Sequence, residues 1–348
     1  FEYARKHKPC IVFLDEIDAI GRKRVDSGSD AGNDGNRTVT SLLTELDGFD
    51  NNDGIFVIAA TNRLDSMDEA LIRPGRFDRK ITIKNPDYKT RQALIQMYIK
   101  NKSISSNVDV DDLAWKLSGF SCAEIENVIN EAAIHALKLN KTVIELSDFE
   151  QVIIQQRING YLLHEENKIY KKELTAYHEA GHALVTYALT DDVVDTISIV
   201  PTTSQVKGFT LSYKTEDRDL MSLKDIEHRI LILMAGRAAE YLFLNEDENL
   251  VTTGCSDDMQ RAVDLMKLYI KTTTRGISYN QKEDRISESL HKELQELSQQ
   301  MWTTTLDYCK TNWDSISILA ESLIEKKWLT KMDVIDLLDE TDVVRKDA

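Results

Sequence analysis

The sequence predicts an α/β domain, then a bundle of helices, then a second domain that is mainly α-helical and carries a small β-sheet. Two apolar runs rich in Val and Ile, at 9–21 and 54–62, are separated by a helical pattern, which is typical of an α/β core. From residue 88 onward the periodicity of the apolar residues becomes helical. We therefore expect domains at 1–86, 87–158 and 172–348, joined by a linker at 159–171.

The composition is typical of a soluble, globular protein of two or three domains. The 348 residues are 42% hydrophobic and 29% charged. The formal net charge of -16 should repel nucleic acid and anionic membranes. The four cysteines are far apart and form no CxxC pair, which favours a reducing compartment. No apolar run approaches the roughly 20 residues that span a bilayer. The opening residues FEYARKHKP resemble the end of a helix already under way, so we expect the sequence to be a fragment.

Three strands and one helix are expected in the first domain. The apolar runs at 9–21 and 54–62 predict buried parallel strands, the first with carboxylates at its C-terminal edge. RKITIKNPD (79–87) predicts a third, shorter strand, and RTVTSLLTELDGF (37–49) predicts a helix. The stretch at 26–36 is rich in Gly, Ser, Asp and Asn and predicts a mobile loop.

Helix-start signals mark the bundle and the second domain. Ser121 with Glu124 predicts a capping box for a helix at 121–139, and Ser147 with Glu150 predicts another for the next helix. In the second domain we expect a helix at 172–190, strands at 193–201 and 207–215, and helices at 222–245, 256–274, 285–325 and 331–340.

Polar side chains at the ends of the first two strands suggest a nucleotide site. An apolar strand that ends in Asp15 and Glu16 has the Walker B pattern, in which the aspartate holds Mg²⁺ and the glutamate polarises the attacking water. Asn62, at the next strand end, could orient the same water. Arg73 and Arg76 suit the charge on a transferring phosphoryl group. The alternative is that all five are solvated surface groups.

These segments resemble the AAA ATPases. IVFLDEIDAIG and AATNRLDSMDEALIRPGRFDR are similar to Walker B and the second region of homology, and GFSCAEIENVINEAA (119–133) is similar to the helical lid. The resemblance implies that Asp15 binds Mg²⁺, Glu16 is the hydrolytic glutamate and Asn62 is the sensor. It also implies that Arg73 and Arg76 are arginine fingers, which act on the nucleotide of a neighbouring subunit in a ring, usually a homo-hexamer.

Two departures from the AAA pattern limit what this chain can do with ATP. These residues contain no G-x-x-x-x-G-K-[ST] loop and no aromatic pore loop. We therefore expect half an ATP site that neither binds ATP tightly nor hydrolyses it, with ATP and Mg²⁺ bound in the complete protein. In the lid, Cys122 and Glu124 stand where the family usually has Gly and Asp.

The segment TAYHEAGHAL (175–184) contains an HExxH pattern. Residues four apart share one face of a helix, so His178 and His182 can bind one metal ion, and Glu179 is placed to accept a proton from water. The alternative is a surface helix that carries two histidines. Catalytic zinc needs a third protein ligand. Glu240, Asp257 and Asp258 are the candidates, and sequence spacing does not choose among them.

The second domain resembles the peptidase domain of FtsH, the membrane-bound AAA metalloprotease family. AYHEAGHAL, AGRAAEYLF and TTGCSDDMQRA carry the resemblance. It implies that Asp258 is the third zinc ligand and that Glu240 orients a histidine, while Asp257 stands where the family usually has Asn.

The resemblance also implies a function. It indicates an ATP-dependent, processive zinc endopeptidase that degrades unfolded and membrane proteins. The family is anchored by an N-terminal membrane segment, with both domains in the bacterial cytoplasm or an organelle interior.

Two other functions are alternatives to the peptidase. One is an AAA remodelling or chaperone ATPase with an inactive peptidase domain, although His178, Glu179, His182 and Asp258 are all present. The other is a nucleic-acid-dependent AAA motor, which the net charge of -16 disfavours. The strands TISIV (196–200) and GFTLSY (208–213) could offer an edge to an extended substrate, or form only a structural hairpin.

Overall fold

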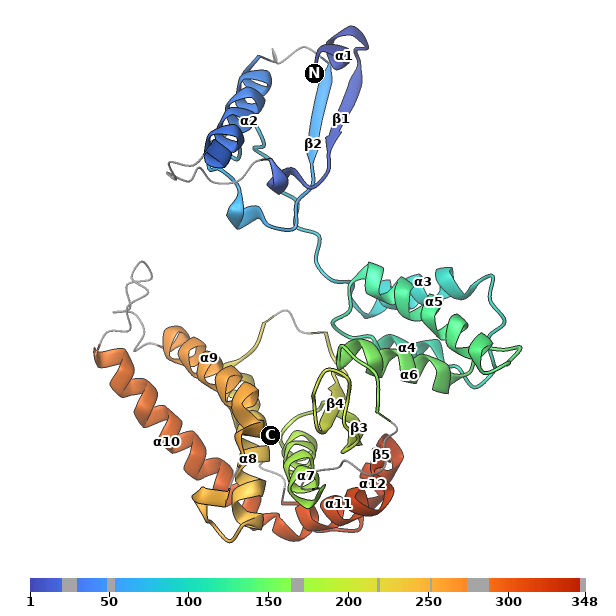
Figure 1. Cartoon of the computed structure of the whole chain (residues 1–348), viewed down its shortest axis with the longest axis vertical. Coiled ribbons are helices and arrows are strands. Elements are labelled where there is room, and N and C mark those ends of the chain that lie inside the picture. Colours follow the sequence, from blue (N-terminus) through green and yellow to red (C-terminus); the bar gives the residue numbers. More distant parts are fainter. Residues whose placement is uncertain are drawn as a thin grey trace. The chain divides into compact units, whose positions relative to one another are not determined.

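The computed structural model describes residues 1–20, 30–48, 54–163, 172–217, 220–250, 252–273 and 288–344. The chain divides into two compact units, 1–84 and 85–348, which are described separately (Figure 1). The expected order of an α/β part, a helical bundle and a mainly helical part with a small sheet is confirmed. None of the helices in these ranges is apolar over enough residues to cross a bilayer.

The first unit is a two-stranded parallel sheet with a helix on one face. The strands β1 (Cys10–Leu14) and β2 (Ile55–Ala59) pair in register from Cys10 with Ile55 to Leu14 with Ala59. The helix α2 (Asp30–Asp47) buries Val39, Leu42 and Leu46 in a cluster with the inner face of the sheet. The unit also contains α1 (Glu2–Lys6), η1 (Ile17–Ala19) and η2 (Leu64–Ser66).

Three predictions for this unit are wrong. Both strands were expected to be buried on both faces, but Ile11, Phe13 and Phe56 on the outer face are 68%, 60% and 73% exposed. No strand forms over 79–87, because within the described residues no strand lies beside this segment, and Ile81 is 89% exposed. The chain is helical from Asp30, so the loop expected at 26–36 is wrong for 30–36, and 26–29 lie outside the described residues.

The second unit begins with four lid helices. They are α3 (Tyr88–Ile99), α4 (Val110–Lys116), α5 (Cys122–Lys138) and α6 (Leu146–Arg157). The capping box predicted at Ser121 and Glu124 is confirmed, since Ser121 N donates to Glu124 Oε2 at 2.7 Å and Glu124 N donates to Ser121 Oγ at 3.3 Å.

The capping box predicted at Ser147 and Glu150 is wrong. The helix α6 begins earlier, with Glu145 as its N-cap residue, and the Asp148 carboxylate accepts a hydrogen bond from Glu145 N at 2.9 Å. Asp148 is fully buried and also accepts from His135 and Lys141. These tertiary contacts outweigh the local Ser-x-x-Glu signal.

The peptidase-like part of the second unit contains six helices, two 3₁₀ turns and one antiparallel sheet within its described residues. They are α7 (Lys172–Leu189), β3 (Val193–Ser198), β4 (Phe209–Tyr213), α8 (Leu223–Phe243), η3 (Glu248–Leu250), η4 (Thr253–Cys255), α9 (Ser256–Thr272), α10 (Glu288–Thr311), α11 (Trp313–Lys326), β5 (Trp328–Thr330) and α12 (Lys331–Asp339). The strand order is β4-β3-β5, so β3 is central and β4 is an edge strand.

The C-terminal region differs from the expected single helix at 285–325. The helix is interrupted at Asn312, which is buried. Its Nδ2 donates a hydrogen bond to Tyr308 O, and its Oδ1 accepts one from Val344 N. The result is two helices, α10 and α11. Lys327 then takes a left-handed conformation (φ 64) and turns the chain into β5, a strand that the sequence analysis did not predict.

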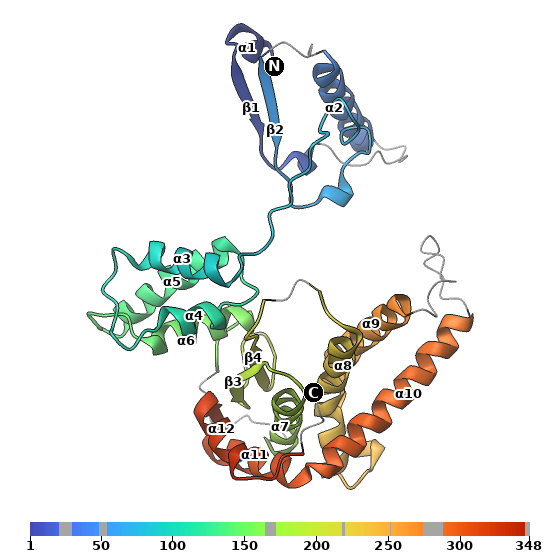
Figure 2. The same cartoon turned by 180° about the vertical axis from the view of Figure 1, so that it is seen from behind.

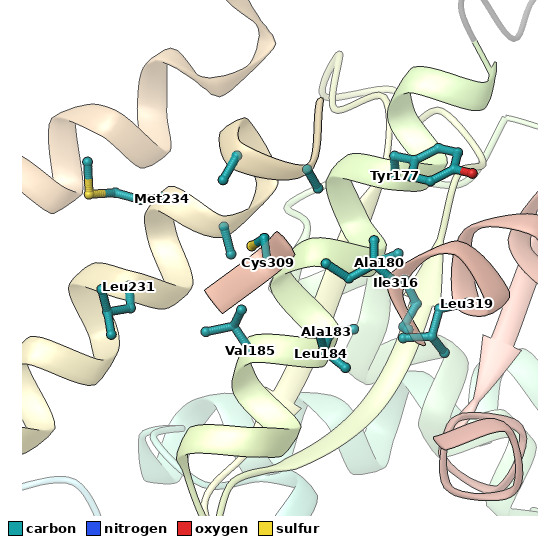
Figure 3. Close-up of a cluster of buried hydrophobic side chains, with 14 of the residues drawn as sticks. Tyr177, Ala180, Ala183, Leu184, Val185, Leu231, Met234, Cys309, Ile316 and Leu319 are labelled. Atoms are coloured by element: carbon teal, nitrogen blue, oxygen red, sulfur yellow. The ribbon is translucent and has the colours of Figure 1, made fainter. Parts of the chain in front are cut away.

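The helix α7 lies between α8 and α11 in the core of this unit (Figure 2). Ala180 and Leu184 of α7 are fully buried and lie beside Ile316 and Leu319 of α11 (Figure 3). On its other side, α7 approaches α8 at Gly181, where an added Cβ atom would lie 2.6 Å from Ala235 O. The HExxH residues are therefore held on a helix that is packed on opposite sides.

Polar contacts join the lid helices to the sheet of the peptidase-like part. Lys116 Nζ pairs with Asp195 on β3, and Arg157 Nη1 donates to Ser212 O on β4 at 3.1 Å. The expected linker is described only as far as residue 163. There Leu163 N donates to Pro201 O at 2.8 Å, so this part of the linker lies against the turn that follows β3.

Candidate metal centre

Two histidines of α7 converge at the candidate metal site. His178 Nε2 and His182 Nε2 lie 3.0 Å apart, as expected for residues one helical turn apart on the same face. His178 is 9% exposed and the side chain of His182 is 12% exposed. Two imidazole nitrogens are thus brought together in a largely buried place.

A carboxylate from the first turn of α9 completes the cluster. Asp258 Oδ2 lies 3.5 Å from His178 Nε2 and 3.3 Å from His182 Nε2. Within the described residues these three form one group whose ligand atoms all lie within 4.8 Å of one another. Asp257 and Glu240 are outside that group, and Asp257 is exposed. Of the three candidate carboxylates, Asp258 alone lies beside both Nε2 atoms.

The Nδ1 atoms of both histidines are engaged within the protein. His178 Nδ1 lies 2.8 Å from Glu240 Oε1, and His182 Nδ1 lies 2.7 Å from Ile232 O. Thr252 Oγ1 donates to the other oxygen of Glu240 at 3.4 Å. When the Nδ1 atom of an imidazole donates to an oxygen, its Nε2 lone pair is free to bind a metal.

Gly236 on α8 leaves the space that the two Nε2 atoms occupy. An added Cβ atom at this position would lie 2.5 Å from His182 Nε2 and 2.7 Å from His178 Nε2. A side chain at position 236 would therefore displace the imidazoles.

The donor set fits zinc. Two imidazole nitrogens and one carboxylate oxygen are the three protein ligands of a common type of catalytic zinc site, with a fourth position left open. The local charges also favour a cation. Burial lowers the pKa of His178, but its hydrogen bonds with Asp258 and Glu240 outweigh burial and raise that pKa to about 10. Burial raises the pKa of Asp258, but hydrogen bonds with the histidines outweigh it and lower that pKa below its usual value.

Glu179 lies next to the cluster but is not part of it. It is 5% exposed, and this burial raises the pKa of its carboxyl group. Thr210 Oγ1 on β4 donates to Glu179 Oε2 at 2.8 Å. A buried carboxylate with a raised pKa is a suitable general base near neutral pH.

The residues predicted for the nucleotide site are at one edge of the parallel sheet. Asp15 and Glu16 follow the C-terminal end of β1, and Asn62 follows the same end of the adjacent strand β2. All three are exposed, as is Arg73. Arg76 instead donates to both carboxylate oxygens of Asp47, at 2.7 and 2.6 Å.

Sequence reasoning missed three residues that shape the metal cluster and its base. Thr210 contacts Glu179 from β4, and Gly208, just before β4, and Gly236, on α8, leave room for Glu179 and for the two histidines. Thr210 is 31 residues from Glu179 along the chain, so no local spacing links them. The only local sign of these contacts in the sequence is a glycine in each of the segments KGFT (207–210) and AGRA (235–238).

Three family descriptions match successive parts of the chain. Residues 1–85 match the ATPase family associated with various cellular activities (AAA), residues 107–151 match the AAA+ lid domain, and residues 166–281 match peptidase family M41. The HExxH helix, the strands β3 and β4 and Asp258 all fall in the match to peptidase family M41, whereas β5 lies beyond it.

Curated relatives extend over nearly the whole chain. An ATP-dependent zinc metalloprotease FtsH from Magnetococcus marinus is 36% identical over 97% of this chain and 53% of the relative. A protein of the same name from Aquifex aeolicus is 44% identical over 76% of this chain and 42% of the relative. ATP-dependent zinc metalloprotease FtsH 2 from Thermoanaerobacter sp. is 35% identical over 98% of this chain and 66% of the relative. The chain spans about half the length of the first two of these relatives.

Proposed function

Because the chain belongs to the FtsH family of ATP-dependent zinc metalloproteases, we propose that it is a zinc endopeptidase whose metal is held by His178, His182 and Asp258. One observation carries this proposal. The two Nε2 atoms and Asp258 Oδ2 lie together, while both Nδ1 atoms are occupied by Glu240 and by a backbone carbonyl. This arrangement is suited to three-ligand zinc binding with one position open for substrate and water.

Glu179 is the general base of the proposed reaction. Zinc would supply a Lewis acid that polarises the scissile carbonyl and makes water a better nucleophile. Glu179 accepts a proton from the attacking water and passes it to the departing amine of the peptide. Burial of Glu179 supports this role, because it raises the pKa of the carboxyl group toward neutral pH.

The first unit supplies the ATPase part of the proposal. Asp15 would hold Mg²⁺, Glu16 would polarise the attacking water and Asn62 would orient it, with ATP bound in the complete protein. Their common position at one sheet edge supports this. Arg73 is the better placed arginine finger, since it is exposed, whereas Arg76 is held by Asp47.

The proposed assembly is a homo-hexameric ring that processively degrades unfolded and membrane proteins. It would be anchored by an N-terminal membrane segment, with both domains in the bacterial cytoplasm or an organelle interior. The edge strand β4 supports binding of an extended polypeptide by strand addition. Over Thr196–Ser198, β3 is already paired on both sides. The formal charge of -16 supports a protein substrate over a nucleic acid.

The first test is the zinc content of the purified protein and of two neighbouring variants. The parent should hold about one zinc ion per chain, and Asp258→Ala should lose most of it because two ligands bind zinc weakly. Asp257→Ala is the matched control and should hold as much zinc as the parent. Elemental mass spectrometry measures all three. Zinc retained in Asp258→Ala, or a folded parent without zinc, would contradict the assignment.

The second test separates the base from the metal ligands. Glu179→Gln should keep its zinc and lose peptide hydrolysis by at least about 100-fold, because the amide cannot accept the proton from water. Cleavage of a fluorogenic peptide and zinc content are measured on the same samples. Full activity in Glu179→Gln would rule out its role as the base. A zinc-loaded parent that cleaves no peptide would favour a remodelling ATPase with an inactive peptidase domain.

A further inference from the structure

The strand β4 contacts Glu179 through the side chain of Thr210. Thr210 Oγ1 lies 2.8 Å from Glu179 Oε2 and 3.0 Å from the backbone oxygen Glu179 O. A hydroxyl carries one proton, so it donates to one of these oxygens at a time, and an ionised carboxylate is the stronger acceptor. The contact therefore occupies Oε2 and leaves Oε1 without this partner.

The second carboxylate oxygen of Glu179, Oε1, lies close to Gly208, which has no side chain. An added Cβ atom at Gly208 would lie 2.9 Å from Glu179 Oε1, 3.0 Å from Glu179 Cγ and 2.6 Å from Thr175 Cγ2. Cβ atoms essentially never lie within 3.0 Å of another heavy atom, so the contacts with Oε1 and Thr175 Cγ2 would force one side to move. Gly208 thus leaves room for Oε1 where it lies, two residues before the hydroxyl that holds Oε2.

The position of Thr210 is fixed by the sheet and by packing. Thr210 pairs with Ile197, and the neighbouring Phe209 pairs with Ser198 on the central strand β3. Ile197 is fully buried. Phe209 packs in a small cluster with Ile154 and lies edge-on to Trp328 at 5.9 Å. A one-residue slip of β4 would expose Phe209 and move the hydroxyl to the opposite face.

We propose that Thr210 is a positioning residue for Glu179. Its hydroxyl holds Oε2 so that Oε1 is the oxygen that accepts the proton from water, and the missing side chain at Gly208 leaves room for Oε1. The inference rests on the proposed role of Glu179 as the base. A carboxylate held in one orientation starts each turnover in a productive geometry, whereas a free one must find it.

The competing explanation is that the hydroxyl only satisfies a buried polar group. Two substitutions at position 210 separate these explanations. Thr210→Val has nearly the same shape but no hydroxyl, and Thr210→Ser keeps the hydroxyl and loses a methyl group. Thr305→Val is the control, because Thr305 is a buried threonine whose hydroxyl donates to Met301 O within α10.

The experiment measures kcat and KM for a fluorogenic peptide, and zinc per chain, on the purified zinc-loaded proteins. Thr210→Val should lower kcat by about 10- to 100-fold, with KM within about threefold of the parent and full zinc content. Thr210→Ser should recover most of kcat, and Thr305→Val should match the parent.

Three results would overturn the proposal. The first is an active parent whose kcat is unchanged in Thr210→Val, and the second is a Thr210→Ser variant as slow as Thr210→Val. The third is a loss of zinc in Thr210→Val, which would place the effect at the metal ligands. A zinc-loaded parent that cleaves nothing would contradict the proposed function itself, and the role of Thr210 with it.

Discussion

Each histidine of the cluster is oriented by a partner that comes from α8. The Glu240 carboxylate forms a hydrogen bond with Nδ1 of His178, and the carbonyl of Ile232 forms one with Nδ1 of His182. Hydrogen bonds of this kind fix the orientation of the ring and typically change metal affinity by about 10- to 100-fold when removed. The histidines themselves follow directly from the HExxH spacing. Their partners do not, because they depend on how α8 crosses α7.

Residue spacing alone does not predict whether Asp257 or Asp258 lies beside the two histidines. The two aspartates are adjacent in the first turn of α9, and successive helical residues point about 100° apart. One therefore faces the histidines and the other faces solvent. Only the rotation of α9 about its axis decides which one, and tertiary packing sets that rotation.

Gly236→Ala should weaken zinc binding by about 10- to 100-fold, because the added methyl group would overlap both Nε2 positions. The same change should not weaken the helix, since Ala has a higher helix propensity than Gly by about 1 kcal/mol. A competition titration with a zinc chelator measures the affinity, and thermal melting of the metal-free parent and variant is the control. An affinity equal to that of the parent would show that the imidazoles can move aside.

At the scale of the elements, two similar cap signals had different outcomes. Ser121 with Glu124 forms the expected box, and within the described residues the two side chains hydrogen-bond only to each other's backbone N–H groups. The start of α6 is decided by Asp148, which binds Glu145 N, His135 Nδ1 and Lys141 Nζ at once. A local motif therefore predicts a helix end only where tertiary contacts agree with it.

Asp148→Asn should destabilise the end of α5 and the start of α6 by about 1–3 kcal/mol at neutral pH, because a neutral amide interacts more weakly than a carboxylate with the Lys141 ammonium group. Burial raises the pKa of Asp148, but its hydrogen bonds outweigh burial and hold that pKa below 3.8. The stabilisation is therefore present above that pH and is lost as the pH falls through the lower, folded-state value.

Hydrogen exchange of the α5 and α6 amides is the measurement for Asp148→Asn. The variant should exchange faster than the parent at neutral pH, and the difference should shrink as the pH falls below 3.8. Glu131→Gln, on the exposed side of α5, is the control and should leave exchange unchanged. Equal exchange in parent and Asp148→Asn at neutral pH would argue against this network.

At the scale of the whole molecule, the sequence predicted the order of the parts and most helices, because hydrophobic periodicity is local. It did not predict β5, which is three residues long and forms only because β3 is there to pair with it. The segment at 79–87 shows the converse. Its apolar residues alternate as in a strand, yet within the described residues no strand pairs with it. Strand pairing is a property of two segments, and one of them alone does not reveal it.

The close approach of α7 and α8 has a consequence for handling the protein. Glycines on both helices, Gly181 and Gly236, permit the contact, and the proposed metal ligands His178 and His182 lie beside it. Separating the helices would therefore pull Glu240 and the carbonyl of Ile232 away from the imidazoles. Metal binding and folding are coupled in such a site. The zinc content per chain of a stored preparation would then report how much of the protein still has α7 packed against α8, because zinc would be lost when the two helices separate.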